Sequence, residues 1–221
     1  MARTPVVQMK GITKTFGHVV ANHKVDLDVY PGEILSLLGE NGSGKTTLMN
    51  MLSGIYFPDE GQIFVEGKPV TIASPKDAFD LHIGMIHQHF KLVDVFSAAE
   101  NIALGLQEGG MLLDRKQVAQ KIRAICDKYG FDVDPDQKVY NMSVSQKQTL
   151  EIVKVLYRGT DILILDEPMN GLDNQGVQEM RQLFLKLKDE GKTILLASHN
   201  REDIAALCDT TVEIDRGKIV K

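Results

Sequence analysis

The chain has 221 residues, of which 43% are hydrophobic and 25% charged, and its formal net charge is −5. This composition is typical of a globular protein and excludes collagen-like, low-complexity and wholly disordered chains. The net charge is negative, whereas proteins that bind duplex DNA or RNA usually carry clustered Lys and Arg, so we expect no nucleic-acid partner.

The sequence shows no clear secretion signal and no clear transmembrane segment. Its two cysteines are too few for a disulfide scaffold and favour a reducing compartment. No run of about 18 apolar residues occurs, and residues 1–7 lack the apolar core of a signal peptide. The sequence therefore predicts a cytoplasmic protein that reaches a membrane only through a partner.

Two kinds of strand are expected. Short, continuous apolar runs predict strands buried on both faces, as in a parallel sheet covered by helices. These runs are residues 34–38, 162–165 and 194–197. Alternating or turn-interrupted segments predict half-exposed antiparallel strands instead. They are residues 25–29, 63–70 with a turn at 66–69, and 212–220 around 216–218.

Two segments repeat apolar residues with the period of a helix. The first spans residues 114–129, where Asp114 is expected to cap the start and Gly130 the end. The second spans residues 174–190 and precedes Gly191.

These elements predict an α/β fold with a mainly parallel sheet, an N-terminal antiparallel β subdomain and an inserted α-helical subdomain. We expect the α/β core in residues 1–87 and 159–221, and the helical subdomain in residues 88–158. No internal repeat or flexible linker is evident, so a single domain over residues 1–221 is the simplest prediction.

A glycine-rich loop follows the first of the buried strands. Residues 39–46 fit the pattern G-x-x-x-x-G-K-[ST], between a strand and a segment with helical spacing. Glycines let successive backbone N–H groups and a helix N-terminus face one anion. In such a loop Lys45 reaches the β- and γ-phosphates and Thr46 binds Mg²⁺. The pattern predicts a P-loop NTPase core whose nucleotide-binding residues are Gly39, Glu40, Asn41, Gly42, Ser43, Gly44, Lys45, Thr46 and Thr47.

Two carboxylates end the predicted strand at residues 162–165. Because ligands of open α/β sheets bind at the carboxyl edge of the strands, we expect Asp166 and Glu167 to face the loop. Asp166 would hold Mg²⁺, through water, and Glu167 would orient and polarise the attacking water as a general base. The alternative is a carboxylate pair that is hydrogen-bonded to neighbouring turns.

Further motifs follow in the order of one known family. Gln88 stands in Met-Ile-His-Gln-His-Phe, the run Ser-Val-Ser-Gln at 143–146 precedes a helical segment, and His199 follows the last buried strand. With the loop and the carboxylate pair, these motifs resemble the nucleotide-binding domain of an ATP-binding cassette (ABC) transporter over essentially the whole chain. The resemblance implies an ATPase whose cofactors are ATP and Mg²⁺.

The resemblance also assigns roles to single residues. It implies that the catalytic residues are Lys45, Gln88, Glu167 and His199. Gln88 would touch Mg²⁺ and the attacking water, and His199 would contact the γ-phosphate. Phe16 takes the place of the aromatic residue that stacks on adenine, where the family more often has tyrosine. Burial of Phe16 in the core near the first strands is the alternative.

Residues 143–146 stand where the family has its signature, Leu-Ser-Gly-Gly-Gln, which completes the ATP site of the opposite domain. Val144 and Ser145 replace both glycines, and this removes backbone freedom near a phosphate. A plain capping box between Ser143 and Gln146 is the alternative. Asp173 matches the aspartate that communicates across the dimer, and a helix cap is its alternative.

The particular residues within the motifs point to one branch of the family. Gly-Glu-Asn-Gly-x-Gly-Lys, the six residues around Gln88, and Ala-Glu-Asn-Ile at 99–102 are similar to those of bacterial sugar and nucleoside importers. This implies a peripheral protein at the cytoplasmic face of the cell membrane that energises solute import. The first implied partner is a second cassette, which is either an identical or a different chain or is fused to this one. Integral membrane permease subunits are the second, and an extracytoplasmic solute receptor is an indirect third. The apolar residues in 90–96 suit a docking surface or burial in the helical subdomain.

Other functions stay open at this point. A soluble ABC ATPase of DNA repair or translation would carry coiled coils, metal clusters or basic linkers, and none is visible in the sequence. An ATP-dependent assembly module with weak hydrolysis would account for Val144 and Ser145. A small-molecule kinase would leave Gln88 and the signature positions unexplained.

Overall fold

The computed structural model describes residues 3–104, 106 and 115–220. It contains ten strands in these residues. They are β1 Val7–Phe16, β2 Val19–Val29, β3 Ile34–Leu38, β4 Glu60–Val65, β5 Lys68–Val70, β6 Ile83–Ile86, β7 Ile162–Asp166, β8 Thr193–Ser198, β9 Thr210–Asp215 and β10 Lys218–Ile219. The α-helices of the same part of the chain are α1 Lys45–Leu52, α2 Pro75–Asp80, α3 Ala98–Ala103, α4 Arg115–Tyr129, α5 Val144–Tyr157, α6 Asn174–Asp189 and α7 Arg201–Leu207.

The N-terminal strands form an antiparallel sheet in the order β2-β1-β4-β5. The turn between β4 and β5 is tighter than expected, because Lys68 and Pro69 already belong to β5. The two turn residues, Glu66 and Gly67, have φ angles of 51° and 74°. Positive φ at both positions is the pattern of a type I′ turn, whose twist matches that of the flanking strands. The prediction of antiparallel strands here is confirmed.

The second sheet has the order β10-β9-β3-β8-β7-β6. Strands β3, β6, β7, β8 and β9 run parallel, and β10 returns antiparallel to β9 as a hairpin. Every residue of β6, β7 and β8 is buried, as expected for a parallel sheet covered on both faces. The three buried strands and the C-terminal hairpin predicted from the sequence are confirmed.

Strands β1 and β6 were not predicted from the sequence. Strand β1 is interrupted at Gly11, where φ is 61° and its pairing with β2 shifts register, so a regular alternation is lost. Strand β6 has only four residues, too few for a periodic pattern to emerge.

Helices α4 and α6 match the two predicted helices. Gly130, at φ 71°, follows the last residue of α4, and Gly191, at φ 84°, follows α6. Glycine is favoured there because it adopts this left-handed conformation without a Cβ penalty. The expected cap at Asp114 lies outside the described residues.

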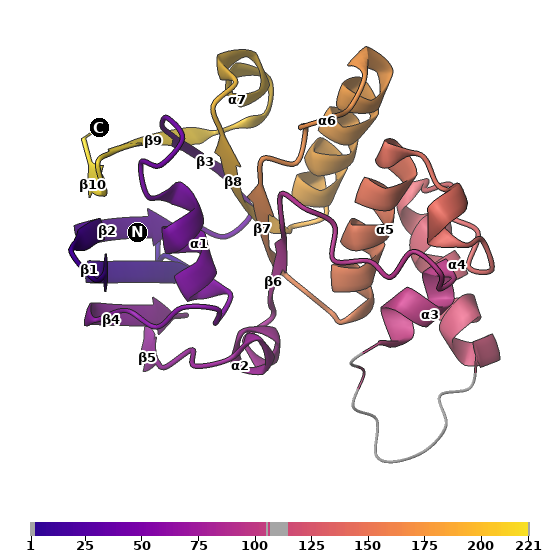
Figure 1. The fold of residues 1–221 in the computed structure, drawn as a ribbon, viewed down its shortest axis with the longest axis horizontal. Coiled ribbons are helices and arrows are strands. Elements are labelled where there is room, and N and C mark those ends of the chain that lie inside the picture. The colour runs from indigo at the N-terminus through magenta and orange to yellow at the C-terminus, as the bar shows by residue number, and fades with distance from the viewer. Residues whose placement is uncertain (1–2, 105, 107–114, 221) are drawn as a thin grey trace.

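Helices cover both sheets and also form a group of their own (Figure 1). Helix α1 lies between the antiparallel and the parallel sheet, and side chains of all three share one buried cluster. Helix α6 and one face of α5 pack against the parallel sheet in a second cluster. The other face of α5 packs with α3 and α4 in a third. The expected division into residues 1–87 and 159–221 against 88–158 stays a prediction.

Candidate functional site

The loop between β3 and α1 depends on two of its glycines. A Cβ on Gly39 would lie 2.4 Å from the Ile214 carbonyl oxygen, and one on Gly44 would lie 2.4 Å from that of Ala21. Gly44, at φ 106°, is also the N-cap of α1, and among the described residues no side chain caps this helix. The first backbone N–H groups of α1 are therefore left for an anion.

Lys45 is folded into the loop that precedes it. Its side chain is buried, and Nζ donates hydrogen bonds to the carbonyl oxygens of Gly39, at 2.7 Å, and Glu40, at 3.0 Å. These bonds close the loop around the ammonium group. An ammonium has three N–H donors, so one remains for a ligand.

Asp166 faces the start of α1 from the end of β7. The Thr46 hydroxyl donates a hydrogen bond to Oδ1 of Asp166, over 3.3 Å. Burial raises the pKa of the Asp166 carboxyl above its usual range, the bond from Thr46 counteracts the rise, and the charge of Glu167 adds to it. An approaching cation would favour the charged carboxylate.

Glu167 is paired with His199, the residue after β8. Its Oε2 lies 2.9 Å from Nδ1 of His199, and its backbone N–H donates to the Ala197 carbonyl at 3.0 Å. Oε1 is buried and has no hydrogen-bond partner in the described part of the chain. Glu167 also has a φ of 51°, an unusual backbone angle for a non-glycine residue. A buried acceptor without a partner is costly, so this oxygen is ready for a donor from a ligand or water.

These groups share one pocket of about 370 Å³. Gln88, which follows β6, completes its lining with the loop and the two carboxylates. The lining residues are Val19, Val20, Ala21, Asn41, Gly42, Gly44, Lys45, Thr46, Thr47, Gln88, Asp166, Glu167, Arg216 and Gly217. The tertiary structure thus brings together the loop, Gln88 and the acidic pair, with His199 bonded to Glu167 and half-exposed.

Phe16 lies at the end of β1 and is not among the residues that line this pocket. It is 43% exposed, so the alternative of a core residue is wrong. Its ring meets the edge of Tyr56 with centroids 5.0 Å apart, and Lys14 Nζ lies 5.5 Å from the ring centroid. Stacking on adenine stays a prediction for this exposed ring.

The signature residues lie elsewhere. Ser143 is the N-cap of α5, and it exchanges two bonds with Gln146: the Ser143 N–H donates to Oε1 at 3.0 Å, and the Gln146 N–H donates to Oγ at 3.2 Å. Asp173 caps α6 by accepting a bond from the Gly176 N–H at 2.8 Å. Both capping alternatives are therefore present as contacts.

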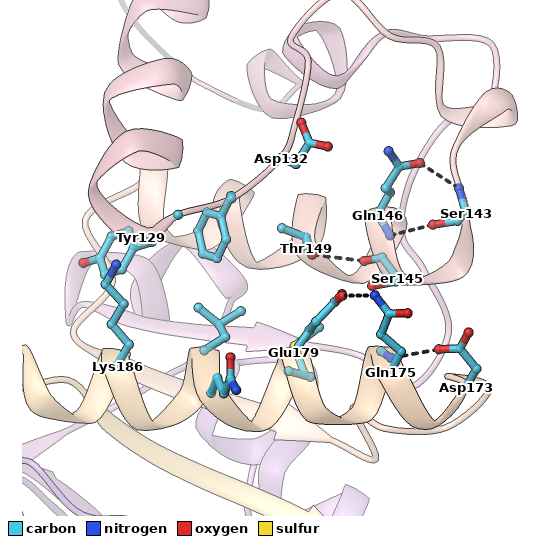
Figure 2. Close-up of a pocket in the computed structure, with 16 residues that line it drawn as sticks. Tyr129, Asp132, Ser143, Ser145, Gln146, Thr149, Asp173, Gln175, Glu179 and Lys186 are labelled. Atoms are coloured by element: carbon cyan, nitrogen blue, oxygen red, sulfur yellow. Dashed lines mark hydrogen bonds between the residues drawn. The ribbon is translucent and has the colours of Figure 1, made fainter.

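Figure 2 shows these caps at one end of a cleft of about 840 Å³ between α5 and α6. Ser143, Ser145, Gln146 and Asp173 line it, whereas Val144 is 44% exposed and does not. None of these residues lines the pocket that contains Lys45 and the two carboxylates. The chain on its own therefore carries two separate polar sites.

Two groups that support the loop are not predicted from the sequence. The Asn22 side-chain amide donates to the Gly44 carbonyl at 3.2 Å, and the Gly217 N–H donates to the Ser43 carbonyl at 2.8 Å. Both come from elements distant in sequence, and no local pattern marks them.

The site has the groups that a magnesium nucleotide requires. Mg²⁺ prefers oxygen ligands, which Thr46 and Asp166 offer side by side. The glycine loop and the uncapped start of α1 suit phosphate groups. The unpartnered Oε1 of Glu167 adds a proton acceptor beside them.

Residues 22–170 match the model of the family described as ABC transporter. The chain belongs to this family. It is 48% identical over its whole length to the nucleoside import ATP-binding protein NupA of Lactococcus lactis and 46% identical over 98% of its length to the guanosine import ATP-binding protein NupO of Bacillus subtilis. It spans only 44% and 42% of these relatives.

Solved structures of ABC cassettes share the fold. CbiO1 of Clostridium perfringens, part of the ABC transporter complex CbiONQ, has a TM-score of 0.84 at 26% identity, over 99% of this chain and 88% of that one. A nucleotide-free ATP-binding cassette from an ABC transporter has a TM-score of 0.89 at 23% identity, over 99% and 90%. The chain is an ABC ATP-binding domain, and such domains of transporters are ATPases.

Residues 3–104 and 115–220 hold no helix that is both long and apolar enough to cross a membrane.

Proposed function

We propose that this domain binds and hydrolyses Mg·ATP to energise the import of a nucleoside or sugar. The observation that carries the proposal is the single pocket that joins Lys45, Thr46, Asp166 and Glu167. NupA, NupO and a ribose import ATP-binding protein of Escherichia coli that is 39% identical over this whole chain support the class of solute.

The loop and α1 hold the substrate. Backbone N–H groups of the loop and of the helix start bind the α- and β-phosphates, and Lys45 extends its remaining N–H toward the β- and γ-phosphates. Thr46 and Asp166 would hold Mg²⁺, Gln88 lines the same pocket, and the bound ion would neutralise phosphate charge. The pocket thereby fixes the γ-phosphate beside Glu167.

Glu167 acts as the general base. Its free Oε1 accepts a proton from the attacking water, while the bond between Oε2 and His199 fixes the orientation of the carboxylate. The Nε2 of His199 remains for the γ-phosphate.

A second cassette is the first proposed partner. The segment 143–146 and Asp173 lie outside the pocket of their own chain, so they serve ATP hydrolysis only by facing the pocket of another cassette. Solved dimeric cassettes of the same fold are consistent with such a pair. The chain covers less than half of its relatives, so the second cassette is either fused to it or separate.

Membrane permease subunits are the second proposed partner. His87, the residue before Gln88, lines a groove of about 160 Å³ at β6, α2 and α5, together with Ile55, Phe79, Met85 and Arg158. Its lining is mainly apolar and also holds Lys91, Arg158 and the ion pair of Lys154 with Glu151, a mixture that suits a helix on a cytoplasmic loop of a permease. This arrangement makes the protein peripheral, at the cytoplasmic face of the membrane, and linked to an extracytoplasmic receptor only through the permease.

Transport in reconstituted vesicles tests the proposal. The full-length protein and its permeases should take up labelled guanosine or ribose only with ATP, and Lys45→Ala should abolish uptake. Uptake that does not depend on ATP would refute the coupling.

A second candidate, an assembly module with weak hydrolysis, is favoured by the exposed Val144 at a signature glycine position. Steady-state phosphate release by the complete transporter separates it from a motor. If phosphate release is no faster while solute is being taken up, the assembly module is favoured.

A further inference from the structure

The hairpin turn between β9 and β10 is fixed directly against the phosphate loop. The Gly217 N–H donates to the Ser43 carbonyl at 2.8 Å, and the Gly217 carbonyl accepts from the His23 N–H at 2.8 Å. A Cβ on Gly217 would lie 2.5 Å from the Ala21 carbonyl oxygen, so only glycine fits. The neighbouring residue, Arg216, is held in a defined place at the pocket by these contacts.

Sheet order decides on which side of the loop Arg216 lies. Strands β9, β3, β8 and β7 are neighbours in that order and run parallel, so the segments after them emerge at one edge. The phosphate loop follows β3, Arg216 follows β9, and Asp166 with Glu167 ends β7. Arg216 and the two carboxylates therefore flank the loop from opposite sides.

Arg216 is an unpaired cation in this pocket. Its side chain is exposed and lines the same cavity as Lys45 and Thr46. In the described part of the chain it has no hydrogen bond and no salt bridge. A guanidinium stays charged at every accessible pH and matches phosphate oxygens with a fork of N–H donors.

Thr46 and the carboxylates mark the end of the pocket where the γ-phosphate reacts. On the opposite side, Arg216 then meets the part of the nucleotide that is farthest from the reaction. We propose that Arg216 binds the α-phosphate and the adjoining ribose oxygens, a nucleotide contact shared by ATP and ADP. This inference rests on the proposed function of the pocket.

The test uses a substitution that suits the turn. Arg216 and Gly217 have φ angles of 44° and 76°, the type I′ pattern, for which Asn-Gly is preferred. Arg216→Asn should therefore keep or raise the melting temperature while it removes the cation. Calorimetry on the full-length protein with ADP and a non-hydrolysable ATP analogue should show Kd values about 3- to 10-fold higher, as expected for one exposed charge-assisted contact.

Both Kd values should rise by the same factor, because both ligands carry the α-phosphate. Arg216→Lys should lose less, since it keeps the charge. Two control variants should bind as the wild type does: Glu66→Asn changes the matching turn of the β4–β5 hairpin, and Arg123→Asn removes an exposed cation from α4.

Unchanged Kd values for Arg216→Asn would overturn the inference, and so would an equal loss in Arg123→Asn. A loss confined to the ATP analogue would overturn the α-phosphate placement. The proposed function fails separately, if the wild type binds neither nucleotide or if Lys45→Ala binds both unchanged.

Discussion

Replacement of Glu167 by glutamine removes the proposed base with little change of shape. The amide oxygen can keep the 2.9 Å contact with His199, and the side-chain volume is nearly constant, so no cavity forms. The remaining amide nitrogen takes the place of Oε1, which has no partner within the described residues. An amide group does not accept a proton from water at neutral pH.

The expected loss follows from this difference. A positioned general base contributes about 10²- to 10⁴-fold to a rate, which corresponds to roughly 3 to 5 kcal/mol of barrier. ATP affinity should stay within about threefold of wild type, because the phosphate contacts of Lys45 and the loop are untouched. We therefore expect turnover to fall and binding to persist.

The assay is phosphate release by the full-length protein with its permeases, with nucleotide binding measured on the same preparation. The matched control is Glu33→Gln, which alters a buried carboxylate at the other edge of the same sheet, where it accepts a bond from the Tyr30 N–H. Turnover of Glu167→Gln within threefold of wild type, or an equal loss in Glu33→Gln, would refute the assignment of the base.

Three further outcomes are expected. Lys45→Ala should raise the Kd for ATP at least about tenfold in calorimetry, since a charge-assisted bond to phosphate is lost; an unchanged Kd would contradict phosphate binding by the loop at 39–46. Phe184→Ala empties a fully buried site on α6 and should cost about 3 to 5 kcal/mol of unfolding free energy, seen as a drop in melting temperature, whereas a change under 1 kcal/mol would contradict the packing. Hydrogen bonds from Lys14 and then Thr15 lower the pKa of Asp59 from 3.8 to about 2. A carboxylate with a lowered pKa stabilises the fold above pH 3.8, and this stabilisation disappears as the pH falls through about 2. Asp59→Asn should therefore have a lower melting temperature than wild type at pH 7 and the same melting temperature below pH 2. Equal melting temperatures at pH 7 would disprove the contribution of Asp59 to stability.

Local sequence patterns were sufficient for the elements that carry the phosphate chemistry. The loop at 39–46 and the acidic pair after β7 each depend on residues adjacent in the chain. Buried parallel strands appear in the sequence as continuous apolar runs because both of their faces are covered. Helices α4 and α6 were predicted in the same way, from a period set by helix geometry.

Helix caps show where local patterns become ambiguous. Ser143 and Asp173 both cap helices in the structure, as the residue types alone allow. The same residues stand at family positions that face another cassette. A local hydrogen bond does not exclude that second role, so their function across a dimer stays a prediction.

The sequence by itself determined the loop, the carboxylates and the class of fold, because each is written in neighbouring residues. Only the tertiary structure decided that the motif residues Gln88 and His199 meet this site and that Arg216, which no motif marks as a site residue, joins them. Gln88 and Arg216 line the pocket, and His199 contacts Glu167, because β6, β8 and β9 run parallel to β3 and end at one edge. Strand order follows from the packing of the whole core, and no spacing along the chain encodes it.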